Sequence, residues 1–463
     1  MAVSTDRDAP SGTITAPRAG RWVDHYDPED AQQWASTGRP AARRNLWLSI
    51  FAEFLGFSVW QLWTIVTPQL GKAGFDLSVD QQFWLIAIPN LVGATLRFPY
   101  TFAVPRFGGR NWTIVSALLL VIPCVGLAIV VQNPDTPFWL MVLVAATAGV
   151  GGGNFASSMA NISFFFPERE KGAALGLNAA GGNLGVAVMQ LAIPIIIVVG
   201  GGFALERAGL VIIPLALVAA VLAWRYMDNL SSAKADFSGY AAAARNKNTW
   251  IMSFLYIGTF GSFIGYAGVF PSLIKTVFPQ VTFDWGFIGF SQVPLTLAFL
   301  GALVGSMARP YGGRLADRVS GARISIAAYA VMALGALGVI ASLSTKSFAF
   351  FFVSFLVLFV ASGVGNGSTY RMIPAIFRAG VDLADPVALT MAKRKAAACI
   401  GIAAGIGAYG GFIVPRVFAN SLTDHGSLVP ALIVFIAFYA VCAVVTWAVY
   451  VRGRATRFAG TSI

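Results

Sequence analysis

The sequence alternates between long apolar runs and short polar connections from about residue 45 to residue 452. A helix needs about 20 apolar residues to cross the ~30 Å hydrocarbon core of a bilayer. Runs of that length recur twelve times, centred near residues 46–68, 83–104, 112–132, 138–165, 173–199, 203–226, 250–274, 286–308, 324–344, 348–376, 391–418 and 428–451. The pattern predicts an all-α membrane protein with twelve transmembrane helices. Composition agrees, because 57% of the residues are hydrophobic and only 11% are charged.

Lysine and arginine fall mainly on alternate connections between the runs. If residues 1–44 are cytoplasmic, twenty basic residues lie in inward loops or at inward helix ends. Only five then lie in outward loops: Lys72, Arg207, Lys275, Lys346 and Arg416. This positive-inside bias predicts that both termini are cytoplasmic and that the chain lies in the cytoplasmic (inner) membrane. The net charge of +12 is dispersed over membrane-proximal loops, which argues against a nucleic-acid partner.

The runs also divide the chain into expected segments. We expect a flexible cytoplasmic tail over residues 1–44, in which Trp22, Tyr26 and Trp34 could rest on a neighbouring surface. The chain then continues with a six-helix bundle over 45–226, a cytoplasmic linker over 227–249, a second six-helix bundle over 250–451 and a cytoplasmic tail over 452–463. We expect a monomer in the lipid bilayer.

Few residues in the sequence offer catalytic or metal-binding chemistry. Cys124, Cys399 and Cys442 sit in separate runs without ligand spacing, so we interpret them as packed thiols that form neither a disulfide nor a metal site. Both histidines, His25 and His425, lie outside the runs, and no nucleophile with an adjacent base is visible. We therefore expect no enzymatic activity, no metal and no cofactor.

The chain repeats itself. "RFPYTFAVPRFGGR" at 97–110 and "RPYGGRLADRVSGAR" at 309–323 both begin with Arg and place a second Arg nine residues later. Arg97 thus corresponds to Arg309 at an offset of 212, and "GVGGG" at 149–153 corresponds to "GVGNG" at 363–367 at an offset of 214. Two parallel six-helix halves joined by a longer cytoplasmic linker are the construction of a major facilitator transporter, in which substrate binds between the halves.

Three arginines lie inside apolar runs, where each costs roughly 2.5–3.5 kcal/mol on insertion scales. Arg371 precedes the inward end of its run by six residues, so we expect it to reach the headgroups or to pair with an acid. Arg97 lies near mid-depth, and Arg309 is its equivalent in the repeat. We interpret Arg97 and Arg309 together as a substrate site.

A symmetric pair of arginines with few acids nearby should attract an anion. The planar guanidinium donates in a fork, which suits a flat oxyanion better than a spherical one. Phe155 lies in another helix of the first half that should face inward, where a ring would exclude water. These residues predict a transporter of a small anion.

Six stretches resemble one family within that superfamily, the nitrate/nitrite (NarK-like) porters, from about residue 45 to 450. The two signature motifs are matched by "GGGNFASSMANISFFFP" with "GAALGLNAAGGNLG" in the first half and by "GVGNGSTYRMIPAIF" in the second. "GATLRFPYTF", "ARPYGGRLADR" and "LYIGTFGSFIGY" resemble the family's helices 2, 8 and 7. The resemblance implies transport of nitrate and nitrite, and it implies a substrate site made of Arg97, Arg309, Phe155, Phe260, Tyr256 and Asn183.

Further motifs indicate how such a carrier would move. We interpret Gly149, Gly151, Gly153, Gly363, Gly365 and Gly367 as close-packing and bending points, because small residues let helices approach one another. A phosphate loop is disfavoured, because the stretch lacks a GxGxxG fingerprint and lies inside an apolar run. "GGRLADRVSGAR" resembles the superfamily's cytoplasmic gating motif, which implies a gating role for Asp317 and Arg318.

Two transport mechanisms stay open. Two permanently charged arginines should make an empty carrier reluctant to reorient, which favours obligatory exchange of nitrate for nitrite. Glu53 in the first run could instead carry a proton and support nitrate–proton symport, or it could pair with Arg43 or Arg44, which we favour. Nitrite export is a further alternative. A non-transporting sensor would need a signalling domain, and an organic phosphate transporter would need a roomier site.

Overall fold

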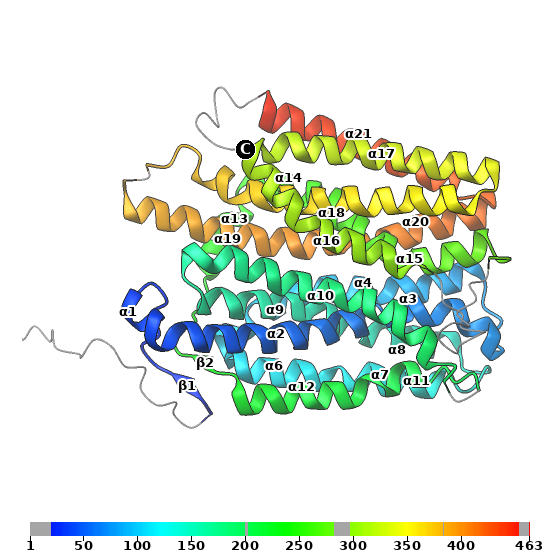
Figure 1. Cartoon of the computed structure of the whole chain (residues 1–463), viewed down its shortest axis with the longest axis horizontal. Helices are drawn as coiled ribbons and strands as arrows, with labels where there is room; N and C mark the ends of the chain where they lie inside the picture. The colour runs from blue at the N-terminus through cyan, green and yellow to red at the C-terminus, as the bar shows by residue number, and fades with distance from the viewer. Residues whose placement is uncertain (1–19, 200–201, 282–296, 383, 453–462) are drawn as a thin grey trace, which may run out of the picture.

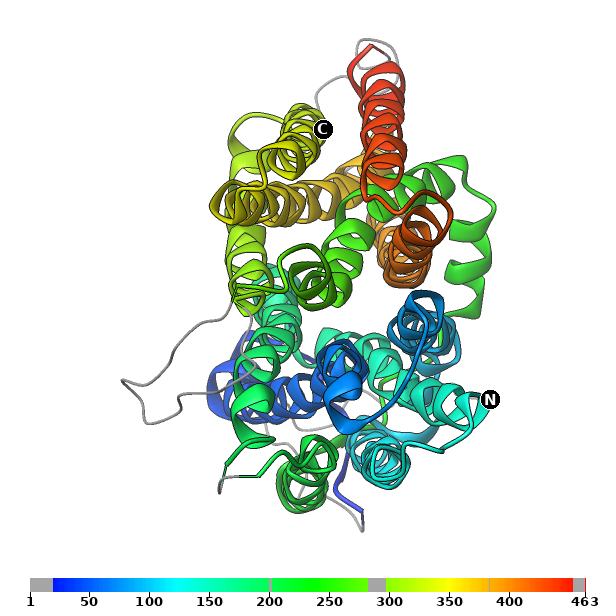
Figure 2. The ribbon, with the colours of Figure 1, turned by 90° about the vertical axis from the view of Figure 1, so that its right-hand side faces the viewer.

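The computed structural model describes residues 20–199, 202–281, 297–382, 384–452 and 463. It is built of long helices that run roughly side by side along one axis (Figure 1). Seen along that axis, the helices of the two halves of the chain form two separate groups (Figure 2). The described helices of the first half are α2 Arg39–Trp60, α3 Leu62–Val66, η2 Thr67–Ala73, α4 Val79–Thr101, α5 Ala103–Phe107, α6 Gly109–Leu119, α7 Val121–Val130, α8 Phe138–Thr147, α9 Gly149–Phe165, α10 Glu168–Ile196, α11 Arg207–Leu210 and α12 Ile212–Tyr226.

The second half follows a linker that carries a short helix, α13 Phe237–Ala244. Its described helices are α14 Lys247–Tyr256, η3 Ile257–Gly261, α15 Ser262–Val277, α16 Phe299–Arg318, α17 Gly321–Thr345, α18 Phe348–Arg378, α19 Pro386–Ala408, α20 Gly410–His425, α21 Val429–Thr446 and η5 Trp447–Val451. Several membrane spans are thus made of two consecutive helices, such as α6 with α7 and α19 with α20.

The helix pattern agrees with the twelve apolar runs. Within the described residues, nine helices are long and apolar enough to span a membrane, and α2 with α3 and η2 forms a tenth span bent by 46°. The two remaining runs correspond to α4 and α16. The first part of the run at 286–308 lies outside the described residues, as do residues 1–19 and 453–462 of the expected tails.

The described part of the N-terminal tail is folded against the first half, which corrects the expectation of a flexible segment. Strand β1, Trp22–Val23, pairs in parallel with β2, Asn229–Leu230, at the start of the linker. Short helical turns α1, Ala31–Gln33, and η1, Trp34–Gly38, then lead into α2. We call residues 20–38 the N-terminal segment.

Buried polar groups hold this segment in place. Asp228 is 2% exposed and binds Arg21 at 2.7 Å and Arg44 at 2.5 Å. The hydroxyl of Tyr26 donates to the carbonyl oxygen of Phe165 at 2.8 Å, where α9 ends. Burial, together with the charge of Asp228, raises the pKa of Tyr26 above its usual value.

The two halves touch along α4, which packs against α19 and α20, and along α10, which packs against α16. At the end far from the N-terminal segment, here called the far end, Arg416 of α20 binds Asp80 of α4 at 2.7 Å. Lys275 of α15 donates there to the carbonyl oxygen of Pro68. These contacts join the halves across the far end.

Candidate functional site between the two halves

Arg97 lies at the interface between the halves and is 1% exposed. Its Nε donates to the carbonyl oxygen of Gly152 in α9 at 3.2 Å, and its Nη1 donates across the interface to that of Ala404 in α19 at 2.9 Å. Its Nη2 is buried without a hydrogen-bond partner among the described residues. The guanidinium is therefore fixed by two carbonyl groups and keeps one donor free.

Three aromatic rings surround this guanidinium. Its Cζ lies 4.5 Å from the ring centroid of Phe155, 5.1 Å from that of Trp60 and 5.3 Å from that of Phe260. Phe155 comes from α9 and Phe260 from η3, so each half supplies a ring. Desolvated cation–π contacts are worth about 2 kcal/mol or more each, which helps to compensate a buried cation.

Arg309 occupies the matching position on α16 and faces a different ring. Its Cζ lies 5.2 Å from the ring centroid of Tyr370, and its Nη1 is buried with no hydrogen-bond partner in the described part of the chain. Tyr370 packs against Tyr256 at 5.2 Å, and Tyr256 stacks on Phe260 at 5.3 Å. We call Phe260, Tyr256 and Tyr370 the aromatic ladder. Arg97 contacts one end of the ladder and Arg309 contacts the other.

A π-helical turn presents Phe260 to this site. The segment η3, Ile257–Gly261, interrupts the helix between α14 and α15. Such turns insert one extra residue and occur often at functional sites. Gly258 and Gly261 provide the room: an added Cβ at Gly258 would lie 2.9 Å from the ring of Tyr329, and one at Gly261 would lie 2.9 Å from the carbonyl oxygen of Gly407.

The signature glycines lie where helices touch most closely. An added Cβ at Gly151 of α9 would lie 2.1 Å from the carbonyl oxygen of Gly56 in α2. In α18, an added Cβ at Gly363 would lie 2.1 Å from the carbonyl oxygen of Gly305. An added Cβ at Gly367 would lie 2.1 Å from the carbonyl oxygen of Arg309 itself. The same crowding applies to Gly149, Gly153 and Gly365. Both glycine motifs therefore pack against the helices that form the site, and α18 touches the backbone of Arg309.

Glu53 lies near the arginines, and its expected pairing with Arg43 or Arg44 is wrong. It is fully buried, and its Oε2 accepts a hydrogen bond from Asn178 at 2.6 Å. Arg44 binds Asp228 instead. Glu53 interacts electrostatically with Arg97 and Arg309, while its Oε1 has no partner within the described residues.

The remaining predicted residues are Asn183, Asp317 and Arg318. Asn183 of α10 is 1% exposed, and its Oδ1 has no hydrogen-bond partner among the described residues. Asp317 forms an ion pair with Arg371, which confirms that Arg371 pairs with an acid. Arg318 is exposed at the end of α16.

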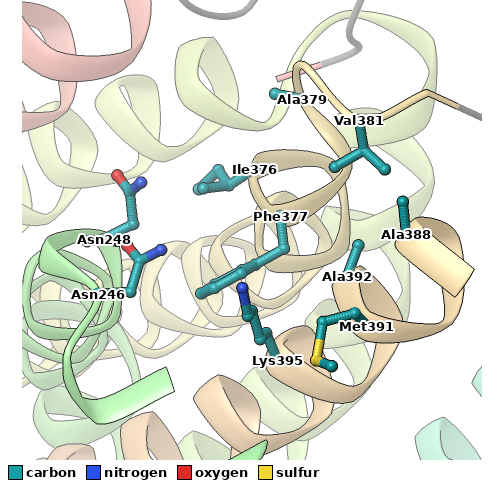
Figure 3. Close-up of a pocket in the computed structure, with 10 residues that line it drawn as sticks. All are labelled: Asn246, Asn248, Ile376, Phe377, Ala379, Val381, Ala388, Met391, Ala392 and Lys395. Atoms are coloured by element: carbon teal, nitrogen blue, oxygen red, sulfur yellow. Dashed lines mark hydrogen bonds between the residues drawn. The ribbon is translucent and has the colours of Figure 1, made fainter. Parts of the chain in front are cut away.

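A hollow of about 490 Å³ lies elsewhere, between the end of α18 and the starts of α14 and α19 (Figure 3). Asn246, Asn248, Phe377 and Lys395 are among its lining residues. It contains no residue of the predicted site.

Sequence reasoning missed Trp60 and Tyr370. Trp60 is one of 12 tryptophans and Tyr370 one of 12 tyrosines, so composition gives no reason to select either. For Tyr370 a signal was present: it lies inside the second signature motif, three residues after Gly367.

Comparison with known proteins decides the family. Residues 46–415 match the model of the Major Facilitator Superfamily. The chain is 40% identical to the nitrate/nitrite transporter NarU of Escherichia coli (strain K12), over 93% of this chain and 96% of NarU. The chain belongs to the nitrate/nitrite porter family of this superfamily.

Further relatives agree with this membership. A probable nitrate/nitrite antiporter of this porter family, NarK2 of Thermus thermophilus, is 37% identical over 95% of this chain and 98% of its own length. Among solved structures, a D-xylose–proton symporter matches with a TM-score of 0.66 at 15% identity, over 88% of this chain and 97% of that chain. That likeness shows the major facilitator fold alone.

Proposed function

We propose that this porter carries nitrate and nitrite across the cytoplasmic membrane by alternating access, exchanging one anion for the other. The observation that carries the proposal is the pair of arginines at the two ends of the aromatic ladder. Within the residues that the structure describes, Arg97 and Arg309 each keep one buried nitrogen without a hydrogen-bond partner. Buried donors normally have partners, so two free donors on two cations favour an anion as their ligand.

The surrounding rings favour a small, flat anion. Phe155 and Phe260 approach the Arg97 guanidinium from the two halves, at 4.5 and 5.3 Å. Planar guanidinium forks match coplanar oxygens, and apolar rings disfavour an anion that keeps its water shell. Nitrate and nitrite, the anions named for the relatives, have this shape.

The same contacts support alternating access. An anion that bridges Arg97 on α4 and Arg309 on α16 draws the two halves together, while the close glycine contacts of α9 and α18 let helices slide. With both termini cytoplasmic, the far end faces outward, and its closure by Asp80 and Arg416 corresponds to a carrier shut on the outside.

Proton symport is a second candidate because Glu53 forms no ion pair among the described residues and is hydrogen-bonded to Asn178 instead. A buried carboxyl near two arginines can take up a proton when an anion binds, which keeps the charge of the site constant. Exchange stays the first proposal, because the two positive charges of the arginines exceed the single negative charge of Glu53. The empty site is therefore positive, which makes an empty carrier reluctant to reorient.

Uptake of nitrate into proteoliposomes separates the two mechanisms. Vesicles are loaded with nitrite, with nitrate or with neither, and a pH gradient is imposed on a parallel set. Exchange predicts uptake only into anion-loaded vesicles. The control is Glu206→Gln, because Glu206 directly precedes α11 and belongs to no part of the candidate site. Uptake into empty vesicles that is driven by the proton gradient, lost in Glu53→Gln and retained in Glu206→Gln would establish symport and overturn exchange.

A further inference from the structure

Nitrate and nitrite differ in the number of oxygens that need hydrogen-bond donors. Nitrate has three and nitrite two. Arg97 offers the free Nη2 and Arg309 the free Nη1, one donor group from each side of the site. Each of these nitrogens carries two N–H bonds and can donate to the oxygens on its own side of a nitrate held between them. An oxygen that faces neither guanidinium needs a donor from another residue.

Tyr370 can supply that donor. Its hydroxyl is buried without a hydrogen-bond partner in the part of the chain that the structure describes, and its ring centroid lies 5.2 Å from the Cζ of Arg309. Tyr370 is thus an unpartnered donor beside Arg309, at the end of the aromatic ladder whose other end contacts Arg97.

The free hydroxyl of Tyr370 differs from those of buried tyrosines elsewhere in the second half. Tyr329 donates to the carbonyl oxygen of Leu255 at 2.7 Å. Tyr439 donates to Ser262 at 2.9 Å and shares a hydrogen bond of 2.5 Å with Tyr266. Buried hydroxyls normally find such partners, so an unpaired one beside the anion site points to a ligand.

Packing holds Tyr370 in this position. Its ring packs against Tyr256 at 5.2 Å with an interplanar angle of 41°. One turn earlier in α18, Gly367 packs directly against the backbone of Arg309. The phenol and the guanidinium are thus held together by the same helix contact.

We propose that Tyr370 selects nitrate over nitrite by donating a hydrogen bond to the third oxygen, which nitrite lacks. The inference rests on the proposed function of the site. A site built to bind a polar group discriminates strongly against a ligand without that group, because the buried donor is then left unpaired.

Calorimetric titration of the purified protein with sodium nitrate and with sodium nitrite tests this inference. Tyr370→Phe removes the hydroxyl and keeps the ring. The dissociation constant for nitrate should rise about tenfold, as expected for loss of one hydrogen bond to a charged group, and that for nitrite should change by less than about twofold. Tyr439→Phe removes an equally buried hydroxyl outside the site and should leave the ratio of the two constants unchanged.

The nitrite titration also reports whether each variant is folded, because it uses the same preparation. If Tyr370→Phe weakens both anions equally, or weakens neither, the selective role of Tyr370 is wrong while the anion site stands. If the native protein binds neither anion, the proposed function itself fails.

Discussion

Replacing Gly367 by alanine should damage the anion site through the backbone alone. The added Cβ would lie 2.1 Å from the carbonyl oxygen of Arg309 and 2.8 Å from the amide nitrogen of Gly313. Ordinary van der Waals contact begins at 3.4 Å. The α16 backbone at Arg309 would therefore have to move by more than about 1 Å, because a close-packed helix contact has no free volume.

Two effects should follow from this displacement. Overpacking a close contact typically costs about 1–3 kcal/mol of folding free energy, so the unfolding temperature should fall. Moving Arg309 away from the proposed anion should weaken a charge-assisted hydrogen bond worth about 1.5–3 kcal/mol. The nitrate dissociation constant should therefore rise at least about tenfold.

Calorimetric titration with nitrate and a thermal unfolding curve of the detergent-purified protein measure both effects. The matched control is Gly313→Ala on the facing helix, where the nearest atom, the carbonyl oxygen of Gly367, lies 3.9 Å from the added Cβ. The control should resemble the native protein. Equal behaviour of Gly367→Ala and Gly313→Ala would refute the packing argument.

Two further predictions concern contacts outside the site. Asp80→Asn removes the ion pair with Arg416, which is worth at most about 1 kcal/mol. The share of molecules that are open at the far end should therefore rise up to about fivefold, seen as longer distances between spin labels on the outer ends of α4 and α20. An unchanged distance distribution would show that the pair does not hold the far end closed. Arg394 of α19 binds Asp236, which caps the start of α13. Hydrogen bonds from Arg394 lower the pKa of Asp236 to about 2, so this ion pair should persist at any pH above the usual value near 3.8 and be lost only as the pH falls through about 2. Protection of α13 from proteolysis should accordingly be constant from pH 5 to pH 8 in the native chain and reduced throughout in Asp236→Asn; equal protection in both would contradict this.

The spans and the arginine pair could be predicted because membrane physics acts on the sequence locally. The bilayer fixes the length of an apolar run, and a charge inside such a run is costly enough to be informative. Arg97 was therefore visible from its position alone, and the internal repeat added Arg309.

Contacts between distant residues could not be predicted in this way. Glu53 is hydrogen-bonded to Asn178, 125 residues later in the sequence. Arg43 and Arg44 are close to Glu53 in the sequence, and pairing Glu53 with them was a wrong prediction. The N-terminal segment pairs with a strand that lies more than 200 residues away, so composition alone suggested a flexible tail. Tyr370 becomes distinctive only when its hydroxyl is seen to lack a partner beside Arg309.

The nitrate dissociation constants of Arg97→Lys and Arg309→Lys test most directly whether one anion is held between the two arginines. Lysine keeps the charge and loses the planar guanidinium, whose several nitrogens can bind backbone carbonyl groups and an anion at once, so each variant should weaken nitrate binding by about 100-fold or more. Arg110→Lys is the control, because Arg110 is a buried arginine that binds the backbone carbonyl of Trp224 in the first half. Affinity in either site variant within about threefold of the native value would contradict an anion bridged by both arginines.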